Sequence, residues 1–195
     1  MSLFTQKQNF RKEVKACLSS LPLGERQARS RAAAEHLLKL PAFRDAACIL
    51  GYMAMGAECD PAFALAAAKE MGKRIVYPKC LPERQLGLYL PRSKDALVPG
   101  AYGIFEPEPS LCEEIAPEEI DLLILPGLAF GRDMTRLGRG AGYYDRLLQR
   151  VSAWKVGFAF DVQLFDTVPV EEWDEKADAV VTNRGIIVNS VYSHL

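Results

Sequence analysis

LLILPGLAFGRDMTRLGRGAGYYDRLL, the stretch from Leu122 to Leu148, joins an apolar run, a glycine-rich basic segment and a change to helical composition. The run 122–125 stops at Pro126-Gly127, which is typical of a short parallel strand buried on both faces. The glycines at 138, 140 and 142 predict a loop after that strand, and Tyr143 would open the first turn of a helix. A buried strand delivering a glycine loop to a helix makes this stretch the candidate centre of an active site.

The glycine segment favours anion binding. Backbone amides without a neighbouring Cβ could wrap an anion, Arg136 and Arg139 could neutralise it, and the following helix would present its positive end. Asp145, in that first helical turn, could hold a metal ion. The spacing matches neither a P-loop nor the dinucleotide fingerprint. A phosphate cradle, a tight packing turn and an RNA-binding Arg-Gly segment therefore all stay open at this point.

Length and charge bound the function. A chain of 195 residues that is 49% hydrophobic suits one domain spanning 1–195, with a core of ordinary size. The net charge of −1 provides no general attraction for a polyanion, so we expect no nucleic-acid partner. We find no run long enough to cross a bilayer and no apolar leader, and we therefore expect no membrane partner and a cytoplasmic location.

Cysteine and histidine usage points the same way. The five cysteines are odd in number and scattered without a C-x-x-C pair, which indicates reduced thiols and argues against a disulfide frame or a zinc site. Only His36 and His194 are present, so an imidazole-based triad or metal centre is not expected. Any metal would be held by oxygen atoms.

Helical and extended patterns alternate from residue 47 onward. We predict an α/β fold with three layers, in which helices flank a mostly parallel sheet with an antiparallel finish near the C-terminus. An N-terminal helical segment precedes it, and residues 81–117 are expected to form a folded loop region around a possible strand. The expected helices are 6–20, 28–40 and 62–71, and the expected strands are 47–53, 74–77, 86–90, 122–125, 155–160, 179–182 and 186–188.

Three further positions could belong to a site. Lys7 and Arg11 share one side of the first predicted helix, and Glu58 lies in the loop after the strand 47–53, where ligands collect in open α/β sheets. Each also has an ordinary interpretation, as a solvated basic face or a surface glutamate. Tyr143 and Tyr144 could equally be core aromatics.

The complete string 126–148 closely resembles the signature of the 5-formyltetrahydrofolate cyclo-ligase family. In that signature a Pro-Gly-hydrophobic-Ala/Gly-Phe turn leads to Arg-Leu-Gly-x-Gly-x-Gly-Tyr-Tyr-Asp. The resemblance extends to Lys7 and Arg11, to Glu58 and to the C-terminal part of the chain. Between Glu58 and the signature, Tyr77-Pro78-Lys79 matches. After the signature, the matching elements are Gly157–Phe160, Gln163, Asp174 and Asp178.

This resemblance implies an enzyme that converts 5-formyltetrahydrofolate and ATP, with Mg²⁺, into 5,10-methenyltetrahydrofolate, ADP and phosphate. By the same resemblance Arg139, Tyr144 and Glu58 would be the catalytic residues. Mg²⁺ would be held by Asp145 and Asp178, although Asp178 could instead be an acid at a strand edge. The implied ATP ligands are Lys7, Arg11, Arg136, Leu137, Gly138, Arg139, Gly140, Ala141, Gly142, Tyr143 and Tyr144.

The folate pocket implied by the resemblance comprises Met53, Glu58, Tyr102 and Tyr144. Glu58 would accept hydrogen bonds from the pterin or formyl region, and the aromatic rings would stack on the substrate. The partners would be the small-molecule substrates 5-formyltetrahydrofolate and ATP. The protein would be a monomer or, alternatively, a dimer. One departure stands out, because Trp173 occupies the histidine position of a Pro-x-x-His-Asp element.

Overall fold

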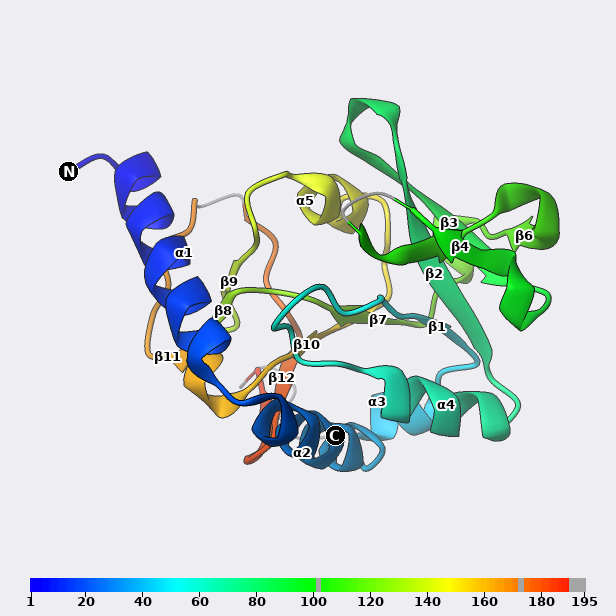
Figure 1. The fold of residues 1–195 in the computed structure, drawn as a ribbon, viewed down its shortest axis with the longest axis horizontal. Helices are drawn as coiled ribbons and strands as arrows, with labels where there is room; N and C mark the ends of the chain where they lie inside the picture. Colours follow the sequence, from blue (N-terminus) through cyan, green and yellow to red (C-terminus); the bar gives the residue numbers. More distant parts are fainter. Residues whose placement is uncertain (101–102, 172–173, 190–195) are drawn as a thin grey trace.

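The computed structural model describes residues 1–100, 103–171 and 174–189, and its centre is one large β-sheet (Figure 1). The strands of this sheet are β1 (Cys48–Leu50), β2 (Arg74–Leu81), β3 (Gln85–Pro91), β6 (Cys112–Glu114), β7 (Leu122–Leu125), β10 (Trp154–Phe158), β12 (Ala179–Thr182) and β13 (Gly185–Val188). Their spatial order is β13-β12-β10-β7-β1-β2-β3-β6.

The middle of the sheet is parallel. The pairs β1–β2, β1–β7, β7–β10 and β10–β12 are all parallel, and the register places Leu50 beside Leu123 and Val156 beside Ile124. The strand β13 closes one edge in antiparallel pairing, and β3 and β6 extend the other. The predicted antiparallel finish at the C-terminal edge is therefore confirmed.

Within the described residues, five α-helices accompany the sheet. Figure 1 shows α2, α3 and α4 on one side of it and α5 on the other, whereas α1 stands at the end of the molecule. They are α1 (Leu3–Ser20), α2 (Leu23–Leu37), α3 (Pro41–Asp45), α4 (Ala62–Glu70) and α5 (Tyr143–Leu148). In the described part of the chain no helix is both long and apolar enough to span a membrane.

Strand β7 shows why the layers form. All four of its residues are fully buried. Leu122 and Ile124 belong to the core shared with α1, α2 and α4, whereas Leu123 and Leu125 belong to a second core shared with α5. A parallel strand needs cover on both faces, and its unbroken apolar run provides a side chain for each. The expected α/β fold with three layers and a mostly parallel sheet is confirmed.

Several boundaries differ from the sequence prediction. Helix α1 begins at Leu3 because Ser2 is its N-cap, with Ser2 Oγ accepting a hydrogen bond from the Thr5 amide at 3.3 Å. Strand β2 does not stop before Pro78 and continues to Leu81. Pro78 lies beyond the last residue that pairs with β1, so its missing N–H removes no hydrogen bond to that strand.

The region expected to be a folded loop contains two short strands besides β3 and β6. These are β4 (Leu97–Pro99) and β5 (Phe105–Pro107), which form an antiparallel hairpin that packs against β2. A second small sheet combines two strands of the signature stretch with one later strand and was not predicted. It consists of β8 (Ala129–Gly131), β9 (Arg136–Leu137) and β11 (Leu164–Phe165).

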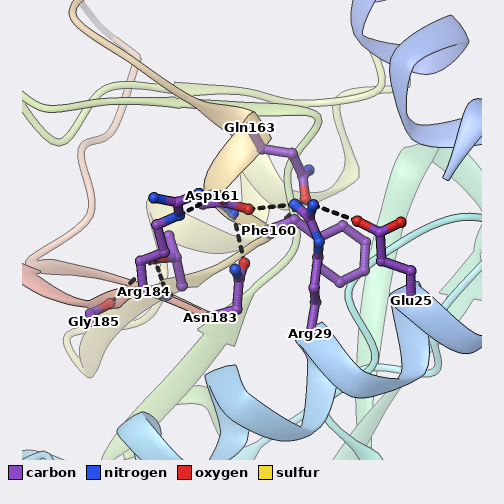
Figure 2. A network of polar contacts seen from close by, with 9 residues as sticks. Glu25, Arg29, Phe160, Asp161, Gln163, Asn183, Arg184 and Gly185 are labelled. Carbon is purple, nitrogen blue, oxygen red and sulfur yellow. Dashed lines mark hydrogen bonds and ion pairs between the residues drawn. The ribbon is translucent and has the colours of Figure 1, made fainter.

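A polar network ties α2 to the ends of β10 and β12 (Figure 2). The Asp161 carboxylate pairs with the guanidinium groups of Arg29 and Arg184, and Arg29 also pairs with Glu25. The Asp161 amide donates to the Asn183 side chain at 2.8 Å. These contacts outweigh the effect of partial burial and lower the pKa of Asp161. The network anchors the helical layer to the edge of the sheet at which the strands end.

Candidate active site

The glycine loop follows the hairpin β8–β9, which in turn follows the end of β7, so it lies at the carboxyl edge of the central sheet. Gly140 and Gly142 have φ angles of +98° and +80°. Residues with a Cβ rarely adopt such angles, and glycine at these two positions lets the chain turn tightly into α5. Gly142 is the N-cap residue of that helix.

Helix α1 brings its two predicted basic residues to this neighbourhood. Arg11 Nε donates to the carbonyl oxygen of Gly138 at 2.9 Å, and a Cβ on Gly140 would lie 3.2 Å from Arg11 Cζ. Lys7 Nζ lies 3.0 Å from Asp174 Oδ2 and 3.4 Å from Glu171 Oε1. Arg11 therefore contacts the loop directly, whereas Lys7 pairs with acidic residues of the segment before β12.

Arg139 connects the glycine loop to Glu58. Its Nε donates to Glu58 Oε1 at 2.6 Å, and one of its terminal nitrogens donates to the Met55 carbonyl oxygen at 3.0 Å. The other oxygen of Glu58 accepts from the Met55 amide at 2.9 Å, and the Glu58 side chain is only 8% exposed. Two residues that are 81 positions apart, and that were predicted to serve different substrates, thus form one charged contact.

Arg136 lies beneath the loop and is almost fully buried. Its guanidinium pairs with the Asp145 carboxylate, and one terminal nitrogen donates to the Pro126 carbonyl oxygen at 3.3 Å. Burial lowers the pKa of Arg136, and the nearby carboxylates of Asp145 and Asp174 oppose that shift. These contacts join the end of β7 to the start of α5, so Arg136 supports the loop from within the protein.

A cavity of about 360 Å³ opens between the glycine loop and the β2–β5 region. Its polar side is formed by the loop 138–142 together with Arg136 and Asp145, and its apolar side includes Met53, Pro78, Leu86 and Phe105. Glu58 and Glu106 also line it. A mostly apolar hollow with a few charged groups is suited to a flat organic ligand that carries polar substituents.

Two tyrosines at the start of α5 border this cavity and also pack on the second core. Burial, and then the Glu58 carboxylate, raise the pKa of Tyr144, so its phenol remains a neutral hydrogen-bond donor. Tyr143 interacts with the Cys80 thiol. The packing and the ligand-binding interpretations of these tyrosines are therefore compatible.

Asp178 is not brought to the other predicted site residues. Its Oδ2 accepts from the Lys155 amide at 2.8 Å, at the position where β10 and β12 begin. Asp145 lies near the end of β7, and a four-residue strand spans about 13 Å. The structure thus places Asp178 at the amino ends of β10 and β12 and Asp145 near the opposite edge of the sheet.

Most of the other predicted site residues lie around the cavity. Met53 lines the cavity, as do Gly138, Gly140, Ala141 and Gly142, whereas Leu137 is a buried residue of β9. Tyr102 and Trp173 lie outside the described residues. Among the described residues no group of three or more His, Cys, Asp or Glu side chains is arranged to hold a metal ion.

Sequence reasoning missed the role of two residues near the cavity. Glu106 is only 4% exposed, and its presence in the apolar run Gly103-Ile104-Phe105-Glu106-Pro107 was a signal that this carboxylate could be buried. Gln163 is 1% exposed, and its amide nitrogen donates to the carbonyl oxygens of Gly127 and Leu128 at 2.9 and 3.0 Å. It holds the turn that begins the signature, a role that required knowledge of the fold.

Comparison with known proteins shows extensive similarity. Residues 4–183 match the model of the 5-formyltetrahydrofolate cyclo-ligase family. The 5-formyltetrahydrofolate cyclo-ligase of Escherichia coli K12 is 33% identical over 165 residues, which cover 81% of this chain and 90% of the relative. The enzyme of the same name from Haemophilus influenzae is 29% identical over 178 residues, which cover 87% of this chain and 94% of the relative.

Solved structures agree with this similarity. The NMR structure of Aquifex aeolicus 5,10-methenyltetrahydrofolate synthetase superposes with a TM-score of 0.86 at 33% identity, covering 97% of this chain and 95% of that one. A 5,10-methenyltetrahydrofolate synthetase from Mycoplasma pneumoniae shares the fold with a TM-score of 0.72 at 23% identity, covering 91% of this chain and 98% of that one.

Proposed function

This chain belongs to the 5-formyltetrahydrofolate cyclo-ligase family, and from that membership we propose that its cavity converts 5-formyltetrahydrofolate into 5,10-methenyltetrahydrofolate with consumption of ATP. One observation carries the proposal to this site. The contact between Arg139 and Glu58 joins a loop suited to phosphate to the wall of a mostly apolar cavity. The two substrates of the reaction need such adjacent compartments.

The chemistry requires two bond exchanges. The formyl oxygen attacks the γ-phosphorus of ATP, a C–O–P linkage forms, and ADP leaves. The N10 nitrogen of the folate then attacks the formyl carbon and loses its proton, and the C–O bond breaks to release phosphate. Because the negative charge in this transfer lies on the phosphate oxygens, the protein contributes mainly alignment and charge neutralisation.

The polar side of the cavity is the part we assign to ATP. The backbone amides of Gly138–Gly142 and the guanidinium of Arg139 would face the transferring phosphate, with Arg11 and Lys7 contributing positive charge from α1. Lys7 would have to exchange its carboxylate partners for phosphate oxygens. Arg136 already has internal partners, and we propose that it keeps the loop in place.

Mg²⁺ fits this site as a companion of ATP. The Asp145 side chain is 55% exposed at the cavity and offers a carboxylate, a ligand that suits a hard cation. Mg²⁺ commonly takes one or two carboxylates and completes its coordination with water and phosphate oxygens, so a single protein carboxylate is sufficient. When bound, the ion would neutralise charge on the β- and γ-phosphates.

All five cysteines are free thiols, and a reducing compartment suits them. We therefore keep the cytoplasm as the proposed location of the enzyme.

The proposal is tested with the purified full-length chain, 5-formyltetrahydrofolate and MgATP. The expected result is the near-ultraviolet absorbance of the methenyl product together with one ADP for each product formed. Arg139→Gln should reduce turnover by at least about 100-fold, as does the loss of other charge-stabilising donors. Arg150→Gln, which alters an exposed arginine just after α5, is the matched control and should retain activity.

The alternatives give different outcomes. Tight folate binding without ADP release would indicate a binding module. ADP release that depends on another formylated compound would indicate a related ATP-dependent enzyme with a changed pocket. Either result would replace the proposed reaction.

A further inference from the structure

Glu106 is a buried carboxylate on the apolar side of the cavity. It is 4% exposed and lies on β5, and its Oε1 accepts from the Cys80 amide of β2 at 3.4 Å. A Cβ on Gly100 would come within 2.5 Å of its Oε2, so the absence of a side chain at Gly100 makes room for it. Burying a carboxylate among apolar groups is costly, and such groups are often retained for binding or catalysis.

The cavity around Glu106 is mostly apolar, which suits the face of a flat ring. Pro78, Leu86, Ile104 and Phe105 line the cavity around it, and Phe105 remains 56% exposed at the surface. Burial, followed by the hydrogen bond to Glu106, raises the pKa of the Cys80 thiol to about 11, so this neighbour stays uncharged at neutral pH. A flat ring entering here would meet apolar surfaces and one carboxylate.

The two carboxylates of the cavity have different surroundings. Glu58 is held by Arg139 of the glycine loop and by the Met55 amide. Glu106 lies on the β4–β5 hairpin, which Figure 1 shows beside β2 and β3, whereas the glycine loop leads from β9 into α5. Tyr144 is close to both the Glu58 carboxylate and the Cys80 thiol. One carboxylate therefore belongs to the phosphate side and the other to the apolar side.

The pterin ring has two ends that match these sides. Its N5 formyl group must reach the transferring phosphate, and this places the reacting end beside Arg139 and Glu58. The 2-amino group and the N3–H lie at the far end of the bicyclic ring and form two parallel donors. A carboxylate accepts two parallel N–H donors in the same bidentate geometry that it uses with a guanidinium.

We propose that Glu106 binds the 2-amino and N3–H edge of the pterin ring and determines the selectivity of the enzyme for 2-amino-4-oxopteridines. This assignment rests on the proposed cyclo-ligase function and deepens it. It also gives Glu58 the reacting end of the substrate. Glu106 takes no part in the bond exchanges, so its removal weakens the binding of folate without affecting that of ATP.

The test compares wild type, Glu106→Gln and Glu113→Gln in steady-state assays. Glu113 is an exposed glutamate on β6, the strand that follows β5 in the chain, and provides the matched control. Because a charge-assisted hydrogen bond pair is lost, Glu106→Gln should raise the KM for 5-formyltetrahydrofolate about 10- to 100-fold. The KM for MgATP should change less than about twofold, and Glu113→Gln should match wild type in both.

A second substrate makes the test specific. The 2-desamino analogue of 5-formyltetrahydrofolate lacks one of the two donors, so wild type should discriminate against it and Glu106→Gln should lose most of that discrimination. A purely structural role would weaken the binding of both substrates by the same factor. Unchanged selectivity in Glu106→Gln would overturn the assignment.

A variant that fails to fold and a wild type that forms no product have different meanings. If Glu106→Gln does not fold, Glu106→Asp replaces it, because the shorter carboxylate keeps the acceptor but cannot keep both hydrogen bonds in place. Glu106→Asp should then show a raised folate KM and reduced selectivity, and wild-type values for both would overturn the assignment. Absence of methenyl product from wild type would instead refute the proposed function itself, so the two failures are distinguishable.

Discussion

Replacing Gln163 with leucine tests whether one buried amide holds the turn at the start of the active site. Gln163 Oε1 accepts from the Phe160 amide at 2.8 Å, and its amide nitrogen donates to two carbonyl oxygens, those of Gly127 and Leu128. Leucine has a similar volume and no polar atom. Gln163→Leu therefore removes three hydrogen bonds from a site that is 1% exposed and leaves one backbone donor and two backbone acceptors without them.

The size of the effect follows from those groups. Each buried backbone group left unsatisfied costs about 1–3 kcal/mol, and the two carbonyl groups fall at the low end because a carbonyl is less costly to leave than an amide. The sum is about 3–5 kcal/mol. Burial of a more apolar side chain offsets about 1–2 kcal/mol. We expect the free energy of unfolding to fall by about 1–4 kcal/mol.

Urea unfolding followed by far-ultraviolet circular dichroism measures this loss. With a slope of about 2–3 kcal/mol per molar, the midpoint should fall by about 1 M while the slope stays unchanged. Gln27→Leu, at an exposed position on α2, is the control and should leave the midpoint within about 0.2 M of wild type. Equal midpoints for Gln163→Leu and Gln27→Leu would refute the reasoning.

Three further predictions concern the network, the loop and the metal site. Asp161→Asn should reduce stability at neutral pH. Because the pKa of Asp161 is lowered in the folded protein, the stability difference from wild type should shrink as pH falls below about 4, as measured by parallel urea titrations. A difference independent of pH would contradict the charge pairing in Figure 2. Gly140→Ala and Gly72→Ala both place alanine at a positive φ and should each lower stability by about 1–2 kcal/mol. Only Gly140→Ala, whose new methyl group crowds the guanidinium of Arg11, should raise the KM for MgATP. Equal ATP kinetics in the two variants would exclude an active-site role for the loop geometry. Asp145→Asn should lower kcat/KM by about 100-fold or more and raise the Mg²⁺ concentration for half-maximal turnover. Because Asp145 also pairs with the buried guanidinium of Arg136, this variant should lose stability too, and its turnover is measured where circular dichroism shows it to be folded. An unaltered Mg²⁺ requirement would remove Asp145 from the metal site.

Local patterns in the chain were sufficient for much of the fold. The apolar run of β7 requires cover on both faces, and this predicted a parallel sheet between helical layers. They were insufficient for residues 74–117, where β2 continues through Pro78 and pairs with β3. A proline normally ends a strand, and it is tolerated there because β2 has by then lost β1 as a neighbour.

The candidate site, too, was predictable only in part from the sequence. Its glycine loop and Asp145 are contiguous in the chain, so their spacing and their resemblance to a family signature were visible without coordinates. Asp178 was grouped with Asp145 on resemblance alone. Its place just before a parallel strand put it at the amino edge of the sheet, away from the edge at which β7 delivers the loop.

By itself, the sequence determined the layers, the loop and the family, because burial periodicity, glycine spacing and a contiguous signature are properties of neighbouring residues. Only the tertiary structure decided that Arg139 meets Glu58, that Arg136 supports the loop from beneath, and that Glu106 enters the cavity. The physical reason is the order of the strands. Sheet order and register bring residues from distant segments to one edge, and neither is encoded by any single segment of the chain.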